Sequence, residues 1–198
     1  MRHKILLLIL VFCSAATSCF RQHAGEKSSQ NAVDSLVDVA GDTAFAYWTR
    51  VHALEDLCKA GAPEKARELL PGIASARTEP EKRIGYWRTA AKAAETQECK
   101  LAYIDSIRQV LLNPDAPDRT HAIEAMAKLN QPLSQNELQQ LRPLAVQDTN
   151  FAAFLNWAEV YLEDGSIDRE RIQKTLDGPD GRAKQLMQYA LDGFIPKN

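Results

Sequence analysis

From about residue 43 onward, apolar residues recur at intervals of three and four, which places them along one face of a helix. One such stripe runs from Tyr47 to Cys58. The alternation of β-branched residues that is typical of strands is absent. Gly and Pro interrupt the pattern, as at Gly61-Ala62-Pro63, because Gly favours the end of a helix and Pro its first turn. The pattern predicts an all-α domain over residues 43–198.

Two capping signals refine the expected helix starts. Thr78 with Glu81, and Ser134 with Glu137, have the spacing of a capping box, in which each residue bonds the backbone of the other. We expect these boxes to open helices that continue through Ala94 and Leu144 respectively. Further helices are predicted over residues 100–112, 117–129, 151–162, 168–176 and 181–192, each bounded by Gly, Pro or polar residues.

The helical stripes also repeat along the chain. Residues 47–51 align with residues 86–90 at a spacing of 39, and two further steps of 35 lead to Ala122 and Trp157. The segment from Leu186 to Leu191 follows about 31 residues later. These intervals are near those of paired-helix repeats, which range from about 34 to about 47 residues. Each repeat would be a helical hairpin that buries its apolar stripe only against its neighbours.

Two stretches resemble known helical repeats. Residues 118–129, with an acidic-basic start before an alanine-rich stripe ending in Leu, resemble the first helix of a HEAT repeat. Residues 60–70 are similar to the turn and second helix of a tetratricopeptide repeat. The resemblance spans roughly Thr43 to Phe194 and implies an α-solenoid of paired antiparallel helices. An irregular helical bundle is the alternative.

The first nineteen residues have the layout of a secretory signal peptide. Arg2 and Lys4 form a short basic start, residues 5–12 are apolar, and small residues at 15–18 lead to Cys19. The apolar run is about half of the ~20 residues that a membrane-spanning helix needs, so export is favoured over a stable span.

The tetrapeptide Ala16-Thr17-Ser18-Cys19 resembles the lipobox of bacterial lipoproteins. That resemblance implies that residues 1–18 are removed and that Cys19 carries a diacylglycerol thioether and an acylated amino group. Several acyl chains together hold a protein on a membrane. The alternative is cleavage by a different peptidase, which leaves Cys19 as a thiol.

Residues 19–42 are expected to form a flexible tether, because their composition is polar and small. A short helix over residues 32–39 is the one regular element that we expect there. Residues 20–23 lack the acidic residues that direct some lipoproteins to the cell surface. The expected location is therefore the cell envelope, on the outer membrane facing the periplasm.

The charge of the chain argues against nucleic acid as a partner. The chain carries 24 basic and 26 acidic residues, a net charge of −2, and loss of Arg2 and Lys4 with the signal peptide would make the charge about −4. Binding to polyanions needs a clustered excess of Lys and Arg, which the sequence lacks.

The sequence contains no complete catalytic or cofactor-binding motif. His52 and His121 have no second ligand at a metal-binding spacing, and acidic pairs such as Asp177 with Asp180 read as helix caps. We therefore expect no enzyme activity, no metal and no cofactor. Cys58 and Cys99 do not form a C-x-x-C pair, but they lie at equivalent helix ends. They form either a structural disulfide in an oxidising compartment or two buried thiols.

Trp48, Trp87 and Trp157 are the candidates for binding. Repeated aromatic residues usually pack between helices, but Trp and Arg are also favoured anchors at interfaces. Neighbouring Arg50 and Arg88 keep the second interpretation open. The sequence favours a non-enzymatic scaffold that binds an envelope protein through a helical-repeat surface. The alternative is a receptor for a small ligand or glycan in a pocket between helices.

Overall fold

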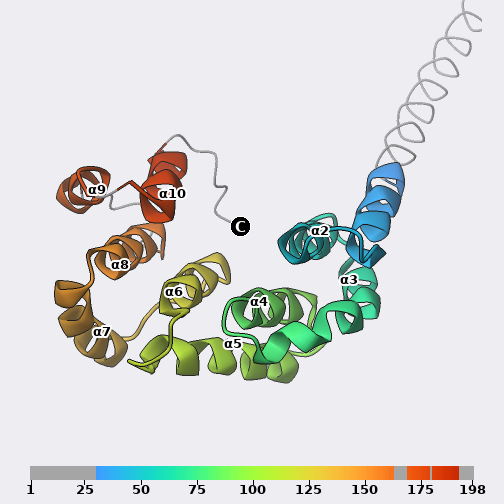
Figure 1. Cartoon of the computed structure of the whole chain (residues 1–198), viewed down its shortest axis with the longest axis horizontal. Coiled ribbons are helices and arrows are strands. Elements are labelled where there is room, and N and C mark those ends of the chain that lie inside the picture. Colours follow the sequence, from blue (N-terminus) through green and yellow to red (C-terminus); the bar gives the residue numbers. More distant parts are fainter. Residues whose placement is uncertain (1–29, 163–168, 179, 192–198) are drawn as a thin grey trace, which may run out of the picture. The chain divides into compact units, whose positions relative to one another are not determined.

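The computed structural model describes residues 30–162, 169–178 and 180–191 (Figure 1). These residues form helices joined by turns, without strands, so the prediction of an all-α fold is confirmed. The predicted signal peptide, Cys19 and the first part of the predicted tether lie outside the described residues. Within these ranges, no helix has both the length and the apolar character needed to cross a bilayer.

The chain divides into two compact units, and the first extends to Leu69. Its described part contains a helix over residues 30–41, α2 (Tyr47–Lys59) and α3 (Pro63–Leu69). The first helix includes the short helix predicted at residues 32–39. It also corrects the tether prediction, since residues 30–41 are regular structure rather than flexible chain. Arg50 Nε donates to the carbonyl oxygen of Ala40 at 2.9 Å, which ties this helix to α2.

The turn between α2 and α3 lies at the predicted Gly-Ala-Pro signal. Gly61 has a φ of +81°, which a side chain would make unfavourable. This conformation lets the Ala62 amide donate to the Leu57 carbonyl at 2.9 Å, while the Gly61 amide donates to Cys58. The hydrogen bonds close the end of α2, and Pro63 opens the next helix where its missing N–H costs nothing.

The second unit begins at Leu70. It starts with the 3-10 helix η1 (Leu70–Thr78), and the remaining helices are α4 (Arg83–Ala93), α5 (Gln97–Leu112), α6 (Arg119–Lys128), α7 (Gln135–Gln147), α8 (Thr149–Leu162), α9 (Arg169–Leu176) and α10 (Arg182–Leu191). Apart from the start of α4, the predicted boundaries agree with these to within about three residues.

Within this second unit the helices form two layers (Figure 1). Helices α4, α6, α8 and α10, here called the even layer, contact one another in sequence order. Helices α5, α7 and α9, the odd layer, pack against them, with α5 contacting α4 and α6, and α7 contacting α8. The positions that recur in the sequence near residues 86, 122, 157 and 186 all lie on the even layer.

One predicted helix start is confirmed and one is wrong. Ser134 and Glu137 form the capping box of α7: the Glu137 amide donates to Ser134 Oγ, and the Ser134 amide donates to a Glu137 carboxylate oxygen. Thr78 instead ends η1, and its hydroxyl donates to the Ser75 carbonyl. Helix α4 begins five residues later because Pro80 disfavours helical backbone at the residue before it.

An apolar core joins the two layers of the second unit. Its fully buried members come from both layers and include Ile104, Ile107, Leu111, Ile123, Met126, Leu141, Phe151 and Trp157. Ion pairs connect neighbouring helices at its edge. Asp118, at the start of α6, accepts two hydrogen bonds from Arg83 of α4 at 2.8 and 2.7 Å. Arg83 and Asp118 are 35 residues apart, one step of the predicted repeat.

Candidate functional site

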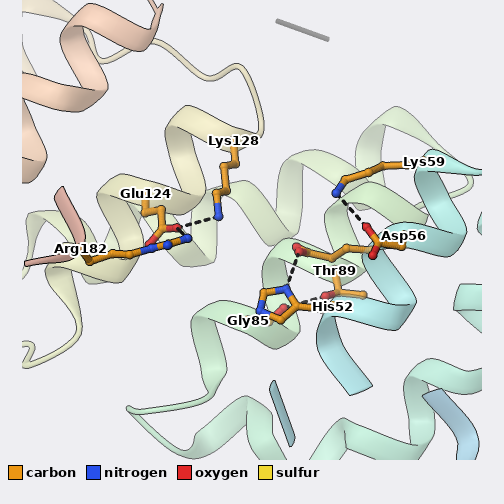
Figure 2. Close-up of polar contacts among 9 residues, drawn as sticks. His52, Asp56, Lys59, Gly85, Thr89, Glu124, Lys128 and Arg182 are labelled. Atoms are coloured by element: carbon orange, nitrogen blue, oxygen red, sulfur yellow. Dashed lines mark hydrogen bonds and ion pairs between the residues drawn. The ribbon is translucent and has the colours of Figure 1, made fainter. Parts of the chain in front are cut away.

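A cluster of charged side chains surrounds Glu124 on α6 in the second unit. This side chain is buried, and its Oε1 atom lies 2.6 Å from Lys128 Nζ and 3.5 Å from Arg182 Nη2. Lys128 is on the same helix, whereas Arg182 begins α10, and Figure 2 shows both side chains reaching the carboxylate. The cluster therefore links two helices of the even layer.

Electrostatics keep the Glu124 carboxylate ionised. Burial by itself raises the pKa of this group, but the positive charges of Lys128, Arg88 and Arg182 outweigh it and lower the pKa below the ordinary value. A general acid at neutral pH needs a raised pKa instead. The geometry of Glu124 thus suits a fixed ion pair between helices.

The two arginines predicted to anchor a partner lie elsewhere than expected. Arg50 is 8% exposed and donates to the Ala40 carbonyl inside the first unit. Arg88 is 5% exposed on α4, and its charge acts on Glu124. The prediction that they are exposed binding residues is therefore wrong, because both guanidinium groups are used within the fold.

The three tryptophans occupy different environments. Trp157 on α8 is completely buried in the core, as the packing interpretation predicts. Trp87 on α4 is partly buried against the same core, and its ring lies 5.8 Å from the Arg83 guanidinium. Trp48 alone among them is substantially exposed, at 37%. It contacts Tyr47 edge to face, with ring centroids 5.1 Å apart.

Phe45 and Trp48 are two exposed aromatic residues near the start of α2, in the first unit. They therefore still fit the prediction that exposed aromatic residues bind a partner.

The two cysteines lie in different environments. Cys58, in the first unit, is partly buried, and Cys99, on α5 of the second unit, is exposed. Both cysteines are thiols in the structure. They lie in different units, so the disulfide stays a prediction, while the exposed Cys99 does not fit the alternative of two buried thiols.

A pocket of about 210 Å³ lies beside α7 in the second unit. Its apolar lining comes from Pro132 and Leu133 before α7, Leu138 on α7 and Leu162 at the end of α8. Three polar side chains complete it: Gln135, Arg142 and Glu159. Arg142 Nη2 lies 3.6 Å from Glu159 Oε1, so an ion pair spans α7 and α8 at this pocket.

The ion pairs of Glu124 and Glu159 are only partly predictable from the sequence. Glu124 and Lys128 have the spacing of a helical ion pair, but Arg182 is distant along the chain and its approach depends on the fold. Glu159 stands one repeat step of 35 after Glu124. That equivalence is the signal by which the buried Glu124 and the partly buried Glu159 could have been found together.

Within the described ranges, no group of three or more His, Cys, Asp or Glu side chains is arranged to hold a metal ion. No protein-family model, no curated protein and no solved structure matches this chain.

Proposed function

We propose that this chain is a lipid-anchored envelope protein whose helical domain is a non-enzymatic scaffold. In this proposal Cys19 holds the protein on the outer membrane, facing the periplasm. The second unit is a degenerate α-solenoid, and the even layer forms its concave side. A protein partner binds along that layer.

One observation carries the solenoid part of the proposal. Positions that recur in the sequence fall on α4, α6, α8 and α10, and these helices contact one another in sequence order. A repeat whose equivalent helices share one layer presents an extended surface, which is how solenoids bind proteins without a reacting group. Separately, the first unit exposes Phe45 and Trp48, aromatic residues of the type found at interfaces.

The receptor alternative has less support. It expects tryptophans around a pocket between helices, yet Trp157 is fully buried and the pocket beside α7 is lined by other residues. Its 210 Å³ is also below the ~300–1,000 Å³ of typical small-molecule sites. We therefore keep the scaffold as the proposed function.

The anchor is tested by Cys19→Ser in a bacterial host. The variant should lose incorporation of labelled fatty acid and leave the membrane fraction, because the thioether cannot form. Cys13→Ser is the matched control, since it removes a leader cysteine that bulky Phe12 precedes, and it should keep both properties. Unchanged membrane retention of Cys19→Ser would reject the anchor.

A further inference from the structure

The pocket beside α7 combines an apolar interior with one exposed positive charge. Leu133, Leu138 and Leu162 supply apolar walls. The Arg142 side chain is 58% exposed, whereas the Glu159 side chain with which it pairs is only 13% exposed. The more accessible of the two charges at this pocket is therefore positive.

Size limits what the apolar part can hold. An apolar cavity of about 150 Å³ accommodates benzene, so 210 Å³ has room for one large apolar side chain and little more. The interior is too small for a long acyl chain, since several methylenes would remain outside. A single side chain of a peptide fits this volume best.

Geometry then determines where the anion of the ligand must lie. Arg142 and Glu159 both line the pocket, so the ion pair between them lies beside the space that the apolar side chain would fill. Its ion pair with Glu159 is long, at 3.6 Å, and the guanidinium has further N–H donors for a second carboxylate. In a C-terminal residue, side chain and carboxylate are attached to the same Cα atom, which matches this adjacency.

We infer that this pocket binds the C-terminal residue of a partner protein, with a leucine-like side chain inside and its terminal carboxylate on Arg142. Gln135, at the first position of α7, offers a side-chain amide to the last peptide group. The site itself is independent of the proposed function. The identification of its ligand as a protein rests on the proposed scaffold.

The test uses the purified full-length chain and the peptide acetyl-Gly-Ala-Leu with either a free or an amidated C-terminus. We expect the free acid to bind about tenfold more tightly than the amide, because a charge-assisted hydrogen bond is lost on amidation. NMR shifts of the Leu133, Leu138 and Leu162 methyl groups should locate both peptides in the pocket. Equal affinity of acid and amide would overturn the inference, as would binding that leaves these methyl groups unshifted.

Two variants distinguish the effect of charge on peptide binding from an effect on folding. Arg142→Gln should remove the preference for the acid, and so should Gln135→Glu, which places an anion beside the pocket. Gln135→Glu also keeps the fold, since an acidic residue in the first turn of a helix is favourable. Gln140→Glu is the matched control: it makes the same change at an exposed position of α7 outside the pocket, and it should bind as the wild type does.

An internal acid is the main competing ligand. If acetyl-Leu-Asp-amide binds more tightly than the C-terminal leucine peptide, the terminal carboxylate is not what Arg142 recognises. If the proposed scaffold function is wrong, these experiments give a different result. In that case the leucine peptide still binds in the pocket, while crosslinking in the envelope recovers no partner.

Discussion

Replacing Glu124 by Gln tests how the even layer is held together. The substitution keeps the shape of the side chain and removes the charge that Lys128, Arg182 and Arg88 share. Loss of a buried ionic partner costs about 3–5 kcal/mol when the remaining charge stays buried. Here Lys128 and Arg182 are partly exposed and can be solvated once the carboxylate is gone, so the expected loss lies below that range. We expect a loss of about 2 kcal/mol in the free energy of unfolding.

The pH dependence follows from the lowered pKa of Glu124. A carboxyl whose pKa is lower in the folded state contributes stability that is complete above its unfolded value, near 4.5. The contribution is lost as the pH falls through the folded-state pKa. The difference between wild type and Glu124→Gln should therefore be full at about pH 7 and shrink below about pH 4.5.

Urea unfolding followed by circular dichroism, at about pH 7 and about pH 3, measures both effects. Glu95→Gln is the control, since this carboxylate is exposed in the turn before α5, and it should change stability little at either pH. A Glu124→Gln variant as stable as the wild type at neutral pH would refute the reasoning. So would a difference that stays constant down to about pH 3.

Three further predictions concern packing, capping and the turn after α2. Trp157→Ala should lower the free energy of unfolding by about 3–5 kcal/mol, measured by urea titration, because the side chain is fully buried; a loss below about 1 kcal/mol would contradict that burial. Ser134→Ala should cost about 1 kcal/mol by the same assay, because it removes the N-cap of α7, and Asn136→Ala is its control. Gly61→Ala should cost about 1 kcal/mol through backbone strain alone, since a Cβ there meets no atom within 4 Å; an unchanged melting temperature would show that this φ is not required.

Periodicity was sufficient to predict the helices, because an amphipathic stripe of ten or more residues has few other ways to bury its apolar face. It placed α5 to α8 and the capping box at Ser134 nearly where they occur. The same spacing at Thr78 and Glu81 does not start a helix, because a capping box specifies two side chains but not the backbone between them. Pro80 lies between these two residues and disfavours helical backbone at Glu79.

The environment of the arginines could not be predicted in this way. Arg50 and Arg88 are candidates for an interface because Trp and Arg are favoured anchors there and each arginine neighbours a tryptophan. In the fold, each lies on a helix whose neighbour supplies a polar partner: the Ala40 carbonyl for Arg50, and the field of Glu124 for Arg88. Such partners depend on which helices meet, and the sequence alone does not specify the distance between them.

The pocket beside α7 was also beyond sequence reasoning. It is lined by residues before α7, on α7 and at the end of α8, and only the packing of these segments defines its volume. The sequence did carry one usable hint, the equivalence of Glu124 and Glu159 across one repeat step. Interpreting that hint required knowing that both positions are largely buried.

Site-specific photocrosslinking in the bacterial envelope tests the central claim most directly. A photoreactive residue is placed at Asn156 or Gln185 on the even layer, and at Asp105 or Gln109 on α5 of the odd layer, a helix that does not line the pocket beside α7. The scaffold account predicts one discrete partner protein, captured from the even-layer positions and not from the odd-layer positions. Discrete crosslinks that arise only from the odd layer would contradict the account.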